Sequence, residues 1–511
     1  MTPFKKRAPE RGEMSSRSRL AYRSLLFLLL AVLFVTRLGG LEIQSLWIDE
    51  LLTAYKARMV ELSAMLNILR EDAAHPPLYY LILWTLGQAA DLGHAASLRA
   101  PSAVAGVLAG LLILLLPQRT FHPEAKVVAL SLFVFSTHAL HYSQEAKSYA
   151  ITMLFGFAAC ILLSRLVSLI PEMSRCTWPL LILLAAVGMA LSATHFFGAV
   201  LIIILFTLIA VLMYATGYRP MSLLIAGALC LLAITPIIGW MLWTAPVLLE
   251  RASSRLSSVE GSYFRLTPDR LLDIPHQWLG GWLIGDESAG AVLVQVMQAA
   301  ILLALAIWTS TSLARWGAWK EQGYRLRVYA VLIGVSVVGV ASLVALSSVT
   351  PMFHPRMVIG FFPFFLIGLS GFITMRREIR PVAITLIPAV AAAGFSASLA
   401  AYYAPFKEQW REVAQGVDGL VQKHPSATLV GQPVSPLWGY YLEPSSGRCE
   451  ICEQTISTHT LMAGGGGSEP VLAYYGAHGG PSTVVWAYLR EKYTYCVETE
   501  YVGAFLYRCF R

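Results

Sequence analysis

Charged residues are scarce in this sequence. Only 13% of its 511 residues are Asp, Glu, Lys or Arg, and 56% are hydrophobic, whereas soluble domains carry about 25% charged residues. This composition excludes a soluble globular protein. Apolar runs of roughly 17 to 25 residues recur along the chain, a length that suits transmembrane helices rather than barrel strands. We therefore predict a polytopic α-helical membrane protein.

A cleavage site is also missing. No small-residue motif follows the first apolar stretch, so we expect a retained membrane anchor rather than a signal peptide. The net charge of +8 does not indicate nucleic-acid binding, because polytopic proteins collect Lys and Arg in their cytoplasmic loops.

The apolar runs predict about eleven membrane spans. They lie near residues 24–43, 99–117, 126–142, 149–167, 178–194, 198–214, 221–243, 287–309, 328–348, 357–374 and 381–401. Basic residues precede the first span at Lys5, Lys6, Arg7, Arg11, Arg17, Arg19 and Arg23, and they are denser in alternate loops after it. The positive-inside rule therefore places the N-terminus in the cytoplasm, and an odd number of spans places the C-terminus outside.

One further apolar segment, 75–93, is not counted as a span. Its apolar part is only about 15 residues long and starts with two prolines, which is short for a membrane helix. We expect it to lie along the outer surface as an amphipathic helix. The first outer loop, 44–98, is then predicted to carry one or two such surface helices.

Residues 402–511 are predicted to form a separate outer α/β domain after the membrane domain, 1–401. The stretch FKEQWREVAQGVDGLVQKH is typical of a helix and ATLVG of a strand, and STVVWAYL and VGAFLYRCF are interpreted as later strands. The run GGGG at 464–467 indicates a flexible loop.

The seven cysteines divide by location. Those in or near spans are expected to be small buried apolar residues: Cys160, Cys176 and Cys230. The other four all lie in the outer domain: Cys449, Cys452, Cys496 and Cys509. An oxidising exterior favours two disulfides among them, with three pairings open. A zinc site built from the same four is the alternative, although the second pair lacks the spacing of a metal finger.

Polar residues that are unusual in a membrane protein fall on the predicted outer side. Asp49 and Glu50 follow the first span in LWIDELLTAY. Four other segments supply the rest: His75; Tyr142, Gln144, Glu145, Lys147 and Tyr149; His195; and His354 with Arg356. Because ionisable groups at membrane depth are costly and tend to line a substrate pathway, we expect these segments to form one site.

Each of these residues also has a plainer structural explanation. A carboxylate pair after a span often caps a solvated helix, and a histidine beside two prolines is often a turn residue. Lys147 and Arg356 can anchor helix ends by snorkelling, and His195 lies between aromatic residues that can simply pack around it. The convergence of opposite charges from five segments favours a site over these separate explanations.

Two carboxylates near several cations suit transfer to a hydroxyl from a phosphate-linked donor. The acceptor hydroxyl needs a base to take its proton, and fixed cations stabilise the charge on the departing phosphate. An outward-facing site has no access to cytosolic nucleotide sugars, which favours a lipid-carried donor. The alternatives are a polar-lipid transporter or flippase, although transporters tend to have two related halves, and a non-catalytic membrane subunit of an envelope glycan assembly.

Six motifs occur in an order typical of one family: LWIDELLTAYKA, AHPPLYYLILWTLG, SLRAPSAVAGVLAG, HYSQEAKSYAI, THFFGAVLII and PMFHPRMVIGFFPFFLIGLSGF. With them, the chain resembles the bacterial branch of the protein mannosyltransferase family over about residues 20–411. It is also similar to the galacturonosyltransferases of rhizobial lipopolysaccharide and, more distantly, to the aminoarabinose transferases of lipid A.

The resemblance implies a GT-C fold and inverting transfer of a sugar from a polyprenyl-phosphate carrier to a lipid, polysaccharide or protein hydroxyl. It implies an active site on the periplasmic face of the bacterial inner membrane. Asp49 would be the base and Glu50 its supporting neighbour, with His75, Lys147 and Arg356 at the donor phosphate. Lys147 stands where the family commonly has arginine, so it offers a point charge rather than a planar fork.

The remaining outer residues would line the substrate path: Tyr142, Gln144, Glu145, Tyr149, His195 and His354. No nucleotide-sugar DxD motif occurs in the outer loops, which fits a metal-independent reaction without cofactors. A divalent ion held by Asp49 and Glu145 is the alternative. The expected partners are the lipid-linked donor, the acceptor and membrane lipids, with no nucleic acid.

Overall fold

The structure is a computed structural model. It describes residues 16–72, 75–172, 176–255, 319–349, 353–404, 407–431, 439–442, 455–457, 471–477 and 483–511, together with isolated positions between 266 and 310.

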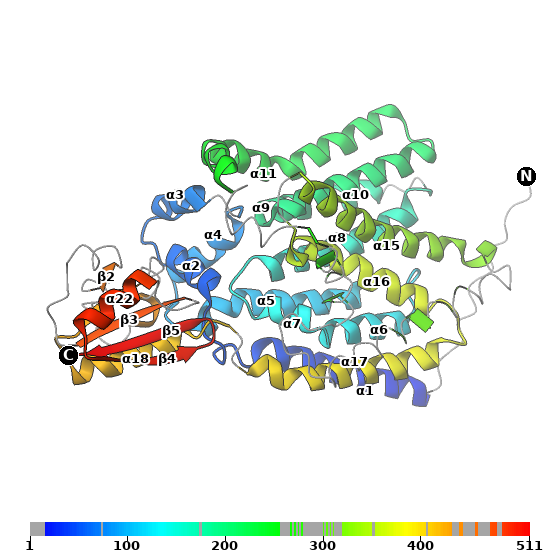
Figure 1. The fold of residues 1–511 in the computed structure, drawn as a ribbon. Coiled ribbons are helices and arrows are strands. Elements are labelled where there is room, and N and C mark those ends of the chain that lie inside the picture. The colour runs from blue at the N-terminus through cyan, green and yellow to red at the C-terminus, as the bar shows by residue number, and fades with distance from the viewer. Residues whose placement is uncertain are drawn as a thin grey trace, which may run out of the picture.

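Most of the described chain is helical, and the long helices lie side by side in Figure 1. They are α1 (Ser16–Leu38), α5 (Ala95–Leu112), α6 (Pro123–Val134), α7 (Thr137–Ser143), α8 (Tyr149–Leu169), α9 (Thr177–Thr194), α10 (Phe196–Ala215), α11 (Pro220–Arg255), α15 (Trp319–Ser347), α16 (Phe362–Ile373) and α17 (Arg380–Tyr403). Short 3-10 turns η1 (Ile113–Leu115) and η2 (Pro355–Phe361) extend α5 and precede α16. Eight helical stretches of the described residues are long and apolar enough to cross a membrane. The chain is therefore a multi-pass membrane protein.

The predicted span at 126–142 is wrong as a single helix, because α6 ends at Val134 and α7 begins after Ser136. Ser136 Oγ accepts a hydrogen bond from Ala139 N at 3.1 Å and so caps α7. The buried Arg37 of α1 donates to the carbonyls of Phe133 and Val134 at 2.9 and 3.2 Å. Arg37 thus satisfies carbonyl groups that a helix end leaves without partners.

Two other features of the bundle bear on the predicted number of spans. Most of the predicted span at 287–309 lies outside the described residues, so the count of about eleven stays a prediction. The segment 75–93 contains only α4 (Leu78–Gly87), and ten helical residues extend about 15 Å, half of the hydrocarbon thickness. This helix is therefore too short to cross a membrane, as expected.

The first loop carries three helices rather than one or two. They are α2 (Ile48–Ala57), α3 (Leu62–Asp72) and α4. Figure 1 shows them between the helix bundle and the C-terminal sheet. Leu51 of α2 and Tyr79 of α4 share a hydrophobic core with Trp410 and Val417 of the C-terminal part. The loop helices are thus fixed from both sides.

The C-terminal part is α/β, as predicted. Its mixed five-stranded sheet has the order β2-β1-β3-β5-β4, with parallel pairing of β1 to β2 and β3 and antiparallel pairing thereafter. The strands are β1 (Thr428–Gly431), β2 (Thr455–Ser457), β3 (Val471–Ala477), β4 (Tyr495–Tyr501) and β5 (Ala504–Phe510), and the helices are α18 (Trp410–Lys423), α19 (Gly439–Leu442) and α22 (Thr483–Lys492). The domain boundary at 401/402 stays a prediction.

The sequence-based strand at STVVWAYL is wrong, because these residues belong to α22. Val485 and Leu489 are both buried, and their spacing of four residues places them on one face of a helix. The other expected elements are confirmed, with FKEQWREVAQGVDGLVQKH forming α18, ATLVG β1 and VGAFLYRCF β5. The expected loop at 464–467 lies outside the described residues.

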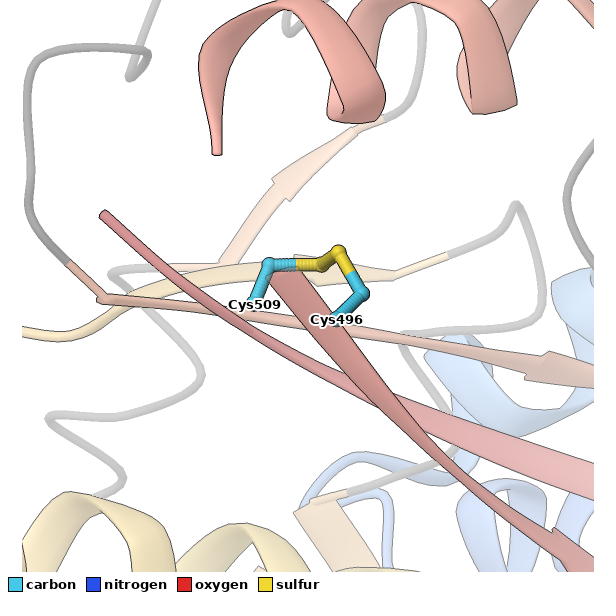
Figure 2. Close-up of a disulfide and its surroundings, with 2 residues drawn as sticks. All are labelled: Cys496 and Cys509. Atoms are coloured by element: carbon cyan, nitrogen blue, oxygen red, sulfur yellow. A yellow bond between two sulfur atoms is a disulfide. The ribbon is translucent and has the colours of Figure 1, made fainter. Parts of the chain in front are cut away.

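One disulfide links neighbouring strands of this sheet. Figure 2 shows Cys496 of β4 bonded to Cys509 of β5, which is its direct partner in the strand register. A zinc site built from all four outer cysteines is therefore wrong, while Cys449 and Cys452 lie outside the described residues. Of the three other cysteines, Cys160 is buried as expected, Cys230 is partly buried and Cys176 is exposed, so the expectation for Cys176 is wrong.

Candidate functional site

Residues from the separated segments meet at the end of the bundle that faces α2 and α4. Arg356 Nη1 lies 3.6 Å from Asp49 Oδ2, and the Arg356 guanidinium lies 5.7 Å from the centre of the Tyr149 ring. The His75 ring is 6.3 Å from that of Tyr149 and 6.1 Å from that of His195. The structure thus brings together side chains from all five predicted segments within one cluster of rings and charges.

The two adjacent carboxylates face different surroundings. Asp49 and Glu50 both lie in the first turn of α2, where the helix dipole favours negative charge. Successive helical residues point about 100° apart, so the two side chains diverge. The Asp49 side chain is 29% exposed beside Arg356, whereas Glu50 is 0% exposed. Only Asp49 is open to a ligand.

Glu50 is occupied by the protein itself. Arg99 donates to it through Nε at 2.8 Å and Nη2 at 2.7 Å, Lys407 Nζ donates at 3.0 Å and Ala146 N at 2.8 Å. Burial opposes ionisation, but the charges of Arg99 and Lys407 and these hydrogen bonds outweigh it and hold the pKa of Glu50 far below its usual range. Glu50 therefore ties α2 to α5 and to the start of the C-terminal part.

Lys147 is a buried cation whose hydrogen bonding differs from that of Glu50. Its backbone carbonyl accepts a hydrogen bond from Ser102 Oγ at 3.1 Å, but its ammonium forms no hydrogen bond or ion pair with any described residue. Burial lowers its pKa, while Tyr80 and Asp49 among others raise it more, so the pKa lies above the usual value. The surrounding protein thus favours the charged form, and because the ammonium makes no hydrogen bond to the described residues, it is available to an anionic group.

Other buried polar atoms near Lys147 also lack hydrogen-bond partners among the described residues. They are both carboxylate oxygens of Glu145, Ser148 Oγ, Tyr149 OH and His75 Nδ1. Native proteins satisfy nearly all buried polar atoms. A group of unsatisfied atoms on neighbouring residues therefore indicates a place where a polar ligand or water binds.

Glu145 remains charged despite its burial. His141 Nε2 lies 3.2 Å from Glu145 Oε2, close enough for an ion pair but not aligned as a hydrogen bond. Burial raises the pKa of Glu145, and the proximity of His141 and then of Lys407 outweighs burial, so the pKa is lowered. Glu145 thus presents an ionised carboxylate with its oxygens available.

Two of the predicted histidines cap helices. Nδ1 of His195 accepts a hydrogen bond from Phe197 N, and Nδ1 of His354 accepts one from Arg356 N, both at 3.2 Å. An accepting Nδ1 belongs to a neutral ring with its proton on Nε2. Burial, followed by the charge of Arg356, lowers the pKa of His195 to about 4. His195 is therefore a hydrogen-bond donor rather than a cation at neutral pH.

His75 is also neutral. Burial and then the charge of Lys147 hold its pKa well below the usual value, and His195, Arg356 and Lys56 act in the same direction. The imidazole of His75 can donate or accept a hydrogen bond, but it adds no positive charge. The charge available to an anion near it comes from Lys147 and Arg356.

Two predicted residues contribute no free polar atom to the cluster. Gln144 Nε2 donates to the carbonyls of Thr36 and Gly39, both at 2.7 Å, and its Oε1 accepts from Tyr402 OH at 3.1 Å. Its amide thus joins α1 to α17. The buried Tyr142 packs its ring 5.0 Å from that of Tyr149 and supports the ring over which Arg356 lies.

Sequence reasoning missed several charged residues that shape the site. Lys56, two turns after Asp49 on α2, is buried, forms an ion pair with Asp72 and lies 5.3 Å from the Tyr80 ring centre. Its spacing from Asp49 could have revealed it. Arg99 and Lys407 offered no such signal, because their partner Glu50 is distant in the sequence.

No group of three or more His, Cys, Asp or Glu side chains is arranged to hold a metal ion within the described ranges. Asp49 faces Arg356, and Glu145 faces His141. The divalent ion considered for Asp49 and Glu145 stays a prediction, as does the absence of a cofactor requirement.

No protein-family model and no curated protein matches this chain. Among solved structures it is similar, at 12% identity, to ArnT from Cupriavidus metallidurans in the apo state (TM-score 0.40, 96% of this chain and 98% of ArnT) and bound to undecaprenyl phosphate (TM-score 0.44, 97% and 98%). It is also similar to the archaeal oligosaccharyltransferase AglB from Archaeoglobus fulgidus in complex with an inhibitory peptide and a dolichol-phosphate (12% identity, TM-score 0.43, 87% of this chain and 65% of AglB).

Proposed function

We propose that this protein is an inverting glycosyltransferase of the GT-C type, which moves a sugar from a polyprenyl-phosphate carrier to a hydroxyl of a lipid, polysaccharide or protein acceptor. The observation that carries the proposal is Lys147, a buried lysine whose ammonium makes no hydrogen bond or ion pair with the described residues and whose charge is favoured by Tyr80 and Asp49. A lipid-linked phosphate is an anion that reaches the end of a membrane helix while its tail stays in the bilayer. Its oxygens would accept the hydrogen bonds that the Lys147 ammonium does not make with the described residues.

Asp49 is the proposed base. The acceptor oxygen attacks the anomeric carbon of the sugar while the bond from that carbon to the phosphate oxygen breaks. The electron pair of that bond leaves with the polyprenyl phosphate, and the acceptor proton passes to Asp49. Arg356 lies 3.6 Å from Asp49, so it faces this carboxylate without occupying it through a short bond, in contrast to Glu50.

The cations stabilise the leaving group. Charge that builds up on the phosphate oxygens is stabilised best by groups already fixed in place. Lys147 is fixed by burial, and Arg356 by its position at the start of η2 and its contact with Tyr149. The neutral rings of His75 and His195 can donate hydrogen bonds to the same phosphate.

The unsatisfied polar atoms suit a sugar. Sugar hydroxyls both donate and accept hydrogen bonds, so they can pair with the acceptor oxygens of Glu145 and with the hydroxyls of Ser148 and Tyr149. We place the site on the periplasmic face of a bacterial inner membrane, because Lys and Arg concentrate in the loops assigned to the other side.

Purified protein in lipid nanodiscs provides the test. A labelled polyprenyl-phosphate hexose is incubated with an envelope lipid and glycan extract, and the products are identified by mass spectrometry. We expect transfer by the wild type, and loss of transfer with retained donor binding in Asp49→Asn. Glu61→Gln, an exposed carboxylate of the same loop, is the matched control and should be fully active. Wild-type turnover by Asp49→Asn would contradict the assignment of the base.

A polar-lipid flippase is the alternative. It would need polar groups along a path through the bundle, whereas Asp49, Arg356 and His195 gather at one end. A flippase would move fluorescent lipid between leaflets without forming a new glycosidic bond. A non-catalytic subunit would do neither, so turnover by the purified protein alone separates the three functions.

A further inference from the structure

The helix that carries Asp49 has no N-cap of its own. The N-cap position of α2 is Trp47, whose side chain makes no capping hydrogen bond. The first backbone N–H groups of a helix have no partner within it, so one must come from elsewhere. Ile48 N donates to Glu408 Oε2 at 3.0 Å, across 360 residues of sequence. A carboxylate is favoured at this end of a helix by the helix dipole.

Glu408 is itself held in place. The same Oε2 accepts a second hydrogen bond from Trp410 Nε1 at 2.6 Å, and the Trp410 ring is buried in the core shared by α2, α4 and the C-terminal sheet. The preceding residue, Lys407, pairs with Glu50 on the same turn of α2. Two consecutive residues of the C-terminal segment thus hold the turn that bears Asp49.

The same segment also binds the chain leading into α2. Arg411 N donates to Ser45 Oγ at 3.1 Å, and the Arg411 side chain donates to the carbonyls of Glu42 and Ile43 at 2.7 and 3.1 Å. These contacts hold the approach to α2 but not its first turn. Arg411 therefore provides a matched control for Glu408 within one segment.

We infer that Glu408 is a positioning residue, a cap supplied by the C-terminal segment that fixes the first turn of α2 and thereby the direction of Asp49 toward Arg356. This inference rests on the proposed role of Asp49 as the base. Without the cap the first turn frays and Asp49 moves. A shift of about 1 Å in a catalytic group lowers turnover about 100-fold, while donor binding at Lys147 and Arg356 is unaffected.

Hydrogen–deuterium exchange and steady-state kinetics of the full-length protein test this inference together. In Glu408→Ala we expect faster exchange in the peptide covering residues 47–57, a fall in kcat of about 10- to 100-fold, and a donor KM within about twofold of the wild type. Glu408→Gln keeps an oxygen that can accept from Ile48 N and should restore most of kcat and of the protection. Arg411→Ala should leave both near wild type.

The two readouts separate the inference from the proposed function. If the wild type transfers no sugar, the proposed function fails, while faster exchange confined to α2 in Glu408→Ala still supports the cap. If α2 exchanges in Glu408→Ala at the same rate as in the wild type, the cap is overturned, whatever the activity of the variant. The cap is also overturned if Glu408→Ala and Arg411→Ala lose kcat and exchange protection equally across the bundle, because Glu408 would then serve only general stability.

Discussion

Two buried carboxylates near the site, Glu50 and Glu145, differ in the hydrogen bonds that they accept from the protein. Glu50 accepts four hydrogen bonds from Arg99, Lys407 and Ala146. Glu145, equally buried, accepts none from the described residues. Burial alone therefore does not distinguish an architectural charge from a functional one. The difference lies in how many hydrogen bonds the protein itself supplies to the carboxylate.

The largest effect on stability is expected at Glu50. Glu50→Gln leaves Arg99 and Lys407 buried without a counter-charge, which costs about 3–5 kcal/mol. Glu145→Gln removes a carboxylate that accepts no hydrogen bond from the described residues but lies 3.2 Å from His141, so it should lower the free energy of unfolding by only about 1 kcal/mol. Thermal unfolding in detergent, followed by intrinsic fluorescence, measures both. Equal destabilisation by the two variants would remove the distinction drawn here.

Lys147 should show the reverse pattern, with a loss of binding and no loss of stability. Lys147→Met removes a charged hydrogen bond to the donor phosphate, worth about 1.5–3 kcal/mol, or about 10- to 100-fold in affinity. Because the ammonium makes no hydrogen bond or ion pair with the described residues, the variant loses only the longer-range attraction of groups such as Tyr80 and Asp49, and its free energy of unfolding should change by less than about 1 kcal/mol.

Calorimetric titration with polyprenyl phosphate measures this affinity, and Lys147→Arg is the control that keeps the charge. An unchanged Kd in Lys147→Met, with normal stability, would mean that the phosphate binds elsewhere.

The lowered pKa of Glu50 predicts a specific pH dependence. A carboxyl whose pKa is lower in the folded state stabilises the fold above its unfolded pKa, about 4.3, and loses that contribution as the pH falls toward the folded value. Between pH 6 and 3.5 the wild type should therefore lose more stability than Glu50→Gln, and the difference between their Tm values should shrink. A difference that stays constant over this range would contradict the ionised state of Glu50.

The smallest effect concerns the two neutral histidines. Because the pKa of His195 is about 4 and that of His75 is well below its usual value, neither should gain a proton between pH 7.5 and 5.5. The affinity for a polyprenyl-phosphate sugar, a phosphodiester with constant charge in this range, should change by less than about twofold. A tenfold increase in affinity at pH 5.5 would show that a histidine becomes charged in the bound site.

The sequence predicted those parts of the molecule that depend on local pattern. Membrane helices follow from long apolar runs. Asp49, His75, Tyr149 and Arg356 are expected at one end of the bundle because the predicted topology places their segments on the same side of the membrane. The helix at 483–492 was missed because its β-branched residues also suit a strand, and only contact of Val485 and Leu489 with the sheet decides its form.

The remaining features depend on partners far apart in the sequence. The break at Ser136 is accompanied by Arg37, some hundred residues earlier, which binds the freed carbonyls. The different parts played by Asp49 and Glu50 depend on Arg99 and Lys407, which no spacing rule connects with them. Sequence patterns therefore locate the site, but the hydrogen-bond partners that separate architecture from function appear only in three dimensions.

Electron cryo-microscopy of the protein with bound polyprenyl phosphate tests the central claim most directly. The account predicts phosphate density within about 3 Å of Lys147 Nζ, beside the Arg356 guanidinium, with Glu50 still bound by Arg99 and Lys407. Phosphate density away from both cations, with Lys147 paired instead to a carboxylate of the protein, would contradict it.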